Sequence, residues 1–359
     1  MNHRFSTLDM IRELSDAPGV SGFEDEILQV GRKYLSEIAE IREDTLRNLY
    51  FYRKKNTGHR PVVMLDCHSD ELGFMVQAIK PNGTLQFITL GGWAESNIPA
   101  HTVLVRNAQG KYIRGIVSAK PVHFMTEEER KRPPAVSQMT IDIGSTSLEE
   151  TVSRFQIQVG APVVPDVSCS YDPENDLLLG KAFDNRLGCA SVVETLWALE
   201  SEQLSVDVVG TFAAQEEVGV RGSQVTANTV RPDLCIVFEG SPADDTFTPD
   251  YAIQTAIKKG PMLRHIDKGM ITNPRLIRYA LELCEQLGIP VQQSVRSGGS
   301  TNGAKIHLSN QGVPCLVIGL PVRYIHSHYG FATLSDFHHS VKLAVELIKR
   351  LNQEMIGKL

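Results

Sequence analysis

The sequence predicts an α/β protein in which a three-layer α/β/α sandwich with a mostly parallel sheet is interrupted by an all-β module. Near the N-terminus, and again from about residue 178 onward, apolar strand-like runs alternate with helical patterns, as in parallel sheets with helices on both faces. Between these regions, short alternating segments are separated by the turn signals KPNGT, LGGW and NAQGK. We therefore expect a sandwich domain made of residues 1–70 and 166–359, and an inserted β-barrel-like domain made of residues 71–165.

The N-terminal elements are predicted from helical periodicity and from one helix start signal. Residues 1–16 have an amphipathic pattern and lack the apolar core of a signal peptide. A second helix follows, for which Ser21 is the expected N-cap and Glu24, three residues later, completes a capping box. A polar strand pattern covers residues 42–55, and a buried strand is expected at residues 61–68.

The C-terminal half shows the same alternation with stronger signals. The run SVDVVGTFAA, which begins at Ser205, is β-branched and apolar, and this predicts a buried strand of a parallel sheet. It leads into QEEVGVRG, in which two adjacent glutamates precede a turn bracketed by glycines. The remaining expected elements are strands at residues 233–240, 290–295 and 313–319, and helices at residues 274–288, 303–308 and 334–354.

Composition excludes several classes of function. The chain has 359 residues and a net charge of −6, so no broad basic surface for nucleic acid is expected. No apolar run approaches the roughly 20 residues that span a bilayer, so no membrane segment is expected. The six cysteines are scattered without C-x-x-C spacing. We expect buried free thiols rather than disulfides or a thiolate metal site, and a cytoplasmic location.

Five segments carry histidine or carboxylate side chains directly after an apolar run, namely CHSDELGF, GKAFDNRLG, AAQEEVGVRG, IVFEGSPADD and RYIHSHYGF. Ligands of open α/β sheets bind beyond the carboxyl ends of the strands, so these side chains are candidates for one shared site. Two imidazoles and three carboxylates suit zinc, cobalt or manganese. If one carboxylate bridges, the set supplies three ligands to each of two metals. The candidate ligands are His68, Asp184, Glu217, Glu239 and His326.

Each segment alone has a simpler interpretation. A pair of glutamates after a strand is often a solvated loop, a single histidine is often structural, and Asp184 could cap the helix that follows it. The coincidence of five such segments favours a metal site. Asp70 lies two residues after His68, on the same face of an extended segment, where it could accept the second ring N–H. Other histidines, namely His328, His338 and His339, are expected at the surface or in support of the site.

The motifs GVSGFEDEI, HSDELGFMV, KAFDNRLG, QEEVGVRG, GAKIHL and RYIHS occur in this order over nearly the whole chain. With them the sequence resembles the dinuclear metallo-aminopeptidases, which include tetrahedral, glutamyl and deblocking aminopeptidases and relatives with frv-operon or endoglucanase labels. The resemblance implies that His68, Asp184 and Glu239 hold one metal. It implies a second metal on Asp184, Glu217 and His326, with Asp184 as the bridge.

The resemblance also implies roles and partners. Glu216 would be the general base that takes a proton from the metal-activated water, and Asp70 would support His68. Two divalent ions per subunit are expected, zinc or cobalt, or else manganese. Peptides would be the substrates, and the inserted module, away from the chemistry, would mediate assembly into a dimer-based dodecamer. Asn302 departs from the family pattern, because the corresponding turn usually carries Asp.

Three other functions stay open at the level of the sequence. A deacylase or carboxypeptidase on a similar dinuclear scaffold would act on substrates with a free carboxylate. A glycosidase would need a carboxylate pair but no metal. A catalytically silent assembly protein would keep the fold without the chemistry, although all expected catalytic positions are occupied here.

Overall fold

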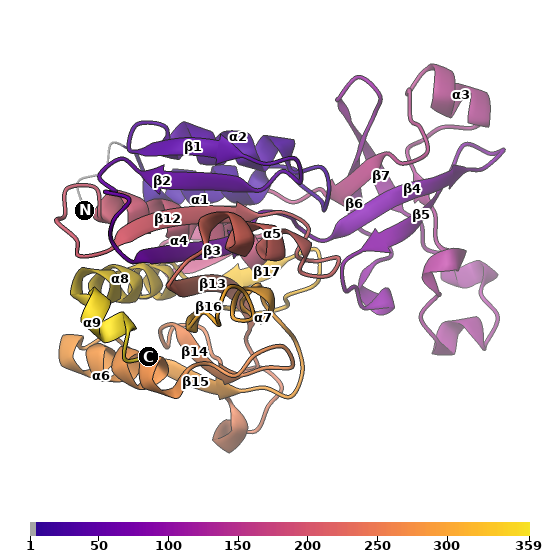
Figure 1. Cartoon of the computed structure of the whole chain (residues 1–359). Coiled ribbons are helices and arrows are strands. Elements are labelled where there is room, and N and C mark those ends of the chain that lie inside the picture. The colour runs from indigo at the N-terminus through magenta and orange to yellow at the C-terminus, as the bar shows by residue number, and fades with distance from the viewer. Residues whose placement is uncertain (1–4) are drawn as a thin grey trace.

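The computed structural model describes residues 5–359, which form a layered α/β part and a β-barrel beside it (Figure 1). The barrel strands lie in one continuous stretch of the chain, and the layered part is built from the segments before and after it. The predicted fold class, an α/β/α sandwich with an inserted all-β module, is therefore confirmed.

An eight-stranded sheet forms the middle layer. Its four central strands, β12, β3, β13 and β16, are mutually parallel and almost completely buried. Such strands have apolar side chains on both faces, which explains the continuous β-branched runs in the sequence. In sheet order the strands are β1 (Ala39–Glu43), β2 (Leu49–Arg53), β12 (Asp207–Ala213), β3 (Val62–His68), β13 (Leu234–Pro242), β16 (Cys315–Val322), β14 (Met262–Ile266) and β15 (Gln292–Val295).

Helices cover both faces of this sheet. On one face α4 packs against the central strands and against α1, α2 and α8, and α6 packs beside α8. On the other face α5 and α7 pack against β3, β12, β13 and β16. Successive strand residues divide between the two layers: Leu65 and Ile236 belong to the larger core, and Met64 and Cys235 to the smaller one. The helices are α1 (Thr7–Asp16), α2 (Asp25–Leu35), α4 (Phe183–Ala198), α5 (Arg221–Val230), α6 (Pro274–Leu287), α7 (Gly303–Ile306), α8 (Leu334–Arg350) and α9 (Gln353–Ile356).

The inserted module is a closed barrel with its own core, which includes Phe74, Phe87 and Val105. Short α3 (Leu148–Ser153) and the exposed charged loop near residues 126–134 extend from it. In barrel order the strands are β4 (Gly73–Ile79), β5 (Leu85–Leu90), β8 (Ile141–Asp142), β7 (Tyr112–Val117), β6 (Thr102–Arg106) and β9 (Pro162–Pro165). A separate three-stranded sheet contains β10 (Ser170–Asp172), β11 (Leu177–Gly180) and β17 (Gly330–Ala332). None of these strands belongs to the barrel.

Four local predictions differ from the structure. The strand pattern expected at residues 42–55 is instead the end of β1, a turn, and β2, which pairs with β1 as an antiparallel hairpin. Helix α1 begins at Thr7 with Ser6 as its N-cap, and residues 1–4 of the predicted helix lie outside the described residues. Helix α2 has no side-chain cap, so the predicted Ser21–Glu24 capping box is wrong. The predicted last helix is divided, because Asn352 caps a separate short helix, α9.

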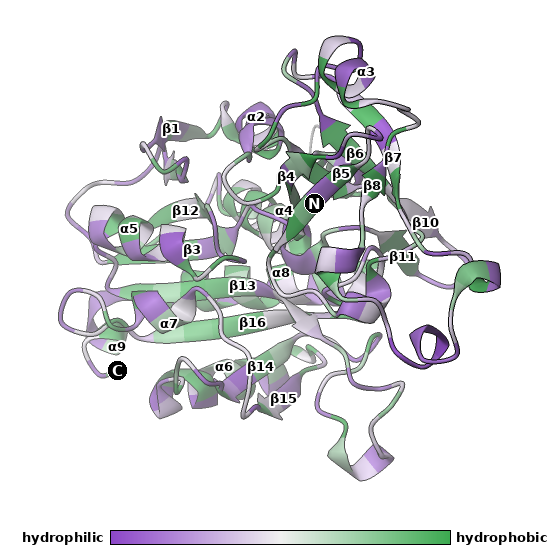
Figure 2. Ribbon diagram, turned by 90° about the vertical axis from the view of Figure 1, so that its right-hand side faces the viewer, coloured by the Kyte–Doolittle hydropathy of each residue, from purple (hydrophilic) through white to green (hydrophobic). Residues whose placement is uncertain are grey.

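The hydropathy of the ribbon follows this architecture, with hydrophobic residues concentrated in the central strands β13 and β16 (Figure 2). All six cysteines are buried and unpaired, as predicted. Among residues 5–359, no helix has both the length and the apolar character needed to cross a membrane.

Candidate metal centre

The candidate ligands meet where the parallel strands end. His68 is the last residue of β3, Glu239 lies within β13, and Glu217 follows β12 by a short loop. Asp184 lies in the non-helical first turn of α4, and His326 lies in the loop between β16 and β17. Carboxyl ends of parallel strands form one edge of a sheet, which is why segments so distant in sequence come together here.

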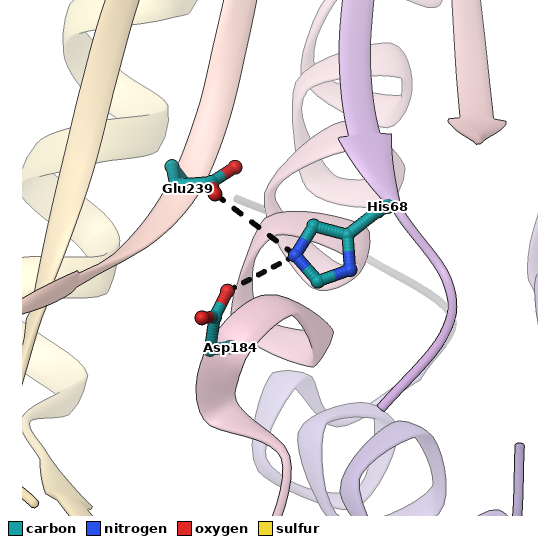
Figure 3. Close-up of side chains that lie close together, drawn as sticks. All are labelled: His68, Asp184 and Glu239. Atoms are coloured by element: carbon teal, nitrogen blue, oxygen red, sulfur yellow. Dashed lines mark hydrogen bonds and ion pairs between the residues drawn. The ribbon is translucent and has the colours of Figure 1, made fainter. Parts of the chain in front are cut away.

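The first group of ligand atoms is His68, Asp184 and Glu239 (Figure 3). The His68 Nε2 atom lies 3.1 Å from Asp184 Oδ1 and 4.0 Å from Glu239 Oε1. The other carboxylate oxygen of Glu239 accepts a hydrogen bond from Asn185 Nδ2 at 3.2 Å, which fixes the plane of the carboxylate.

The second group shares Asp184 with the first and adds Glu217 and His326. The His326 Nε2 atom lies 3.4 Å from Asp184 Oδ2 and 3.7 Å from Glu217 Oε2. The two oxygens of Asp184 therefore face two different histidines. The structure brings all five predicted ligands into two adjoining trios with one common carboxylate.

Glu216 lies next to this centre without belonging to either trio. Its Oε2 atom is 4.0 Å from His68 Nε2, whereas Glu217 faces His326. Asp70 fixes the backbone of the two glutamates. Its carboxylate accepts hydrogen bonds from the backbone N–H groups of Glu216 at 2.9 Å and Glu217 at 3.1 Å.

Both candidate histidines are oriented through their Nδ1 atoms. For His68 the neighbours are the Asp70 carboxylate at 3.3 Å and the Asp70 carbonyl at 3.1 Å, so Asp70 lies where the sequence predicts it. For His326 the neighbour is the carbonyl oxygen of Gly92 at 2.9 Å. Gly92 belongs to the barrel, and sequence reasoning missed it because a backbone carbonyl leaves no signature in side-chain types. The expectation that the module lies away from the chemistry is wrong.

Ser21 and Glu24 support the same loops instead of capping a helix. The Ser21 hydroxyl donates to Asp70 Oδ2 at 2.6 Å, and Glu24 Oε1 accepts the backbone N–H groups of Gly22 and Gln215. Both side chains are buried. The N-terminal GVSGFE motif therefore fixes the position of the QEE loop from a distant part of the chain.

A buried ion network joins this loop system to α4. Lys181 Nζ lies 2.6 Å from Glu71 Oε1, and Arg186 Nη2 lies 3.3 Å from the same oxygen. Arg186 Nη1 also donates to the carbonyls of Leu14 and Ala17. Because Glu71 closely follows His68 and Arg186 closely follows Asp184, the network fixes the two ligand segments relative to each other.

The carboxylates of the centre are crowded and buried. Burial raises the pKa of Glu216 to about 7, and the charges of Asp184 and Asp70 add to the shift. Burial also raises the pKa values of Glu217 and Glu239 well above the usual range, again with a contribution from Asp184. Glutamates in this position are destabilised as anions unless a cation lies among them.

The histidines stabilise the shared carboxylate. Burial opposes ionisation of Asp184, but hydrogen bonds with His326 and His68 lower its pKa overall. Burial lowers the pKa of His326, but its contacts with Asp184 and Glu217 raise it to about 9. Charged groups of both signs therefore converge on Asp184.

The donor set fits divalent cations. Glu217 Oε1 is buried and has no hydrogen-bond partner among the described residues, although buried polar atoms are normally satisfied. The atoms of the two trios are imidazole nitrogens and carboxylate oxygens, the ligand types of zinc, cobalt and manganese. A cation in each trio would neutralise the crowded carboxylates.

A cavity of about 640 Å³ opens beside the centre. Its walls include Glu216, Glu239 and two arginines, Arg264 and Arg296, together with the glycine-rich segment of residues 297–300. This volume suits a small ligand or one end of a peptide. The centre is therefore open to substrate on one side.

The remaining residues singled out in the sequence lie outside the two trios. Asn302 is buried and donates to Asp66 Oδ2 at 2.7 Å, so an aspartate at position 302 would place two carboxylates together. His328 is buried, which excludes the surface alternative for it. His338 and His339 lie on α8, the first exposed and the second half-buried, and neither belongs to a trio.

The chain is similar to known proteins over nearly its whole length. The M42 glutamyl aminopeptidase family matches residues 48–343. Glutamyl aminopeptidase of Lactococcus lactis subsp. cremoris strain MG1363 is 30% identical over 353 residues, which cover 98% of this chain and 98% of that protein. The TET aminopeptidase of Thaumarchaeota archaeon SCGC AB-539-E09 has a TM-score of 0.93 at 36% identity, over 98% of this chain and 99% of that one. The TET1 peptidase of Pyrococcus horikoshii, which can assemble into a tetrahedron or a large octahedral shell, has a TM-score of 0.86 at 25% identity, over 96% and 100% of the two chains.

Proposed function

Because the chain belongs to the M42 glutamyl aminopeptidase family, and is thus a metal-dependent aminopeptidase, we propose that it works with two divalent ions, zinc or cobalt or else manganese. His68, Asp184 and Glu239 would hold one ion, and Asp184, Glu217 and His326 the other. The observation that supports this assignment is that the ligand atoms of each trio lie within 4.8 Å of one another.

The proposed reaction removes the N-terminal residue of a peptide. Two divalent ions at these positions would polarise the scissile carbonyl and lower the pKa of a water. Glu216 takes the proton of that water and passes it to the leaving amine, a role that needs a pKa near the working pH. Its place on the cavity wall, outside both trios and with Oε2 4.0 Å from His68 Nε2, supports this role. Asp70 accepts hydrogen bonds from the backbone N–H groups of Glu216 and Glu217. These bonds would keep Glu216 directed at the water and Glu217 at its metal position.

We propose that the cavity prefers an acidic N-terminal side chain. Arg264 is buried, contacts Asp267 at 3.1 Å and Ser241 at 3.2 Å, and its Nε atom has no hydrogen-bond partner among residues 5–359. Arg296, on the same wall, pairs with Asp244 at 3.1 Å. Guanidinium groups bind carboxylates with directed hydrogen bonds. The same arginines could bind the terminal carboxylate of a substrate, which keeps a carboxypeptidase or deacylase as the second candidate.

A substrate panel separates the aminopeptidase from the carboxypeptidase or deacylase. It contains the aminoacyl-p-nitroanilides of Glu, Leu and Lys, and N-acetylated glutamate substrates for comparison. The protein is first stripped with a chelator, and zinc, cobalt or manganese is added back. We expect hydrolysis of the free-amine substrates only, fastest for Glu. Arg264→Met should lower kcat/KM for the Glu substrate about 10-fold relative to Leu, whereas the exposed Arg278→Met should not. Preferred cleavage of the N-acetylated substrates would favour the second candidate.

We also propose that residues 71–165 are a distinct domain that mediates assembly into a dimer-based dodecamer. The TET1 relative can assemble into a tetrahedron or a large octahedral shell, and the barrel of this chain exposes Val122 and Phe124 at 52% and 72%. Sedimentation of the double variant Val122→Ser, Phe124→Ser should show smaller species. Phe247→Ser, which changes an exposed residue outside the barrel, is the control. An unchanged large assembly in the double variant would show that Val122 and Phe124 do not make the subunit contacts.

We further propose that the protein acts in the cytoplasm. Six buried free thiols suit a reducing compartment. Cell fractionation with an antibody to the chain would test this, and recovery from the extracytoplasmic fraction would contradict it.

A further inference from the structure

The loop between β16 and β17 carries His326 in an unfavourable backbone conformation. Tyr324 has a φ of 62° and His326 a φ of 59°, both in the left-handed region that non-glycine residues rarely adopt. Such conformations persist only where the surroundings impose them, and they are concentrated at functional sites. The position of His326 therefore depends on the contacts that this loop makes with the rest of the molecule.

The first contact that holds it comes from the barrel. The carbonyl of Gly92 accepts the His326 Nδ1–H at 2.9 Å, which directs Nε2 toward Asp184 and Glu217. The approach is close, because a Cβ atom on Gly92 would lie 3.2 Å from Nδ1. In addition, a Cβ atom on neighbouring Gly91 would lie 2.0 Å from Leu72 Cδ2. Gly91 also has a φ of 87°, which favours glycine in the turn that brings the Gly92 backbone against His326.

The second contact is an aromatic stack around His328, two residues beyond His326. The His328 ring lies parallel to the His101 ring, with a centroid distance of 4.0 Å and an interplanar angle of 6°. The Trp93 ring lies 4.9 Å away on another side and is itself stacked on Phe74 at 4.8 Å. His328 is 1% exposed, and among the described residues its ring nitrogens make no hydrogen bond of normal geometry, although the backbone of Ile98 lies near the ring. The ring is therefore held by packing.

We propose that His101 and Trp93 of the barrel, acting through His328 and the Gly92 carbonyl, are positioning residues for His326 and so set the affinity of one of the two metal positions. The inference rests on the proposed two-metal function. The barrel then has a second role besides assembly. Within the loop, Ser327 Oγ donates to the carbonyls of Tyr324 and Tyr329. The barrel contacts act instead on the ring of His326 itself and on its neighbour His328.

The effect should be confined to one metal position. His68 and Glu239 lie on the central strands β3 and β13, within the sandwich. His68 is oriented by Asp70 rather than by the barrel. Loosening the loop should therefore lower the affinity for the ion held by Asp184, Glu217 and His326. The affinity for the other ion should not change.

The test compares His101→Ala, His328→Ala and His328→Phe with the wild type in the full-length protein. His328→Phe retains a flat ring but removes both nitrogens. The control is His59→Ala, which removes an exposed histidine outside both the aromatic stack and the proposed assembly loop. Each protein is dialysed against buffers of increasing free zinc. Bound zinc per chain is measured by elemental analysis, and unfolding temperature by calorimetry.

We expect the wild type and His59→Ala to bind two ions. His101→Ala and His328→Ala should bind one ion normally and the second about 10–100-fold more weakly, as for other groups that orient metal ligands. His328→Phe should restore most of the second affinity. A variant that was merely destabilised would instead unfold at a lower temperature and lose both ions together.

Three outcomes would overturn the inference. Two ions at wild-type affinity in His101→Ala and His328→Ala would show that the stack does not position His326. Equal loss in His328→Phe and His328→Ala would show that the ring nitrogens act directly. A wild type that binds a single ion would instead refute the two-metal function on which the inference depends.

Discussion

The adjacent residues Glu216 and Glu217 should fail in different ways when each is changed to glutamine. Glu217 Oε2 lies 3.7 Å from His326 Nε2 in the second trio, whereas Glu216 Oε2 lies 4.0 Å from His68 Nε2 outside both trios. Glutamine keeps the size and one carbonyl oxygen of glutamate, but it cannot carry a negative charge or accept a proton at physiological pH. The two variants therefore separate metal binding from proton transfer.

The structure sets the expected magnitudes. Loss of a general base costs about 10²–10⁴ in rate, which is roughly 3–5 kcal/mol of barrier. Glu216→Gln should lose this much kcat while KM and metal content stay near wild type. Glu217→Gln should lower the affinity for one ion by more than about 10–100-fold, the loss that is typical when a group that only orients a metal ligand is removed. Its metal-free form should be no less stable than wild type, because Glu217 Oε1 is buried without a partner and burial disfavours the charge.

The assay combines metal stoichiometry by native mass spectrometry, kcat and KM on one aminoacyl-p-nitroanilide, and the unfolding temperature of chelator-stripped protein. If Glu216→Gln loses an ion while Glu217→Gln keeps both, the two roles are reversed. If Glu216→Gln stays fully active, the proton is transferred by another group, and the proposed mechanism is wrong.

Three further predictions concern the metal, the ion network and pH. Chelation should abolish hydrolysis, and zinc or cobalt should restore it; full activity in protein shown to be metal-free by elemental analysis would refute metal dependence. Glu71→Gln should destabilise the protein by about 3–5 kcal/mol in urea unfolding, since it leaves Lys181 and Arg186 buried without their carboxylate. A loss below about 1 kcal/mol would mean that both cations reach solvent. In chelator-stripped protein, burial raises the pKa of Glu24 and of Glu216 to about 7 from 4.5. At these two glutamates the folded state binds more protons than the unfolded state. Their contribution to stability is therefore full below pH 4.5 and is lost as the pH rises through about 7. Glu24→Gln should reduce the fall in stability over this range, and an unchanged slope would contradict burial of Glu24 as a cause.

Much of the fold was predictable because its signals are local. Continuous β-branched runs predicted the buried parallel strands, and β3 and β12 lie where those runs lie. Turn signals with period-two alternation predicted an all-β module, which is the closed barrel. Histidine and carboxylate side chains after strands predicted a shared site, because parallel strands place their carboxyl ends at one edge. Each of these inferences needs only neighbouring residues and one rule of sheet geometry.

Other features depend on contacts between segments far apart in the chain. Ser21 and Glu24 match a capping box, but their oxygens bind Asp70 and the QEE loop, because the folded chain brings those partners within reach. The local pattern could not reveal this, since a side chain that satisfies a helix end can equally satisfy any N–H group placed beside it.

By itself, the sequence determined the elements, the fold class and the kinds of ligand atom at the site. Only the tertiary structure decided which groups hold those ligands in place. The Gly92 carbonyl meets His326 across 234 residues, and Asn302 meets Asp66 across 236. A backbone carbonyl has no side chain that marks it, and a buried pair depends on the packing of whole layers rather than on the residues next to it.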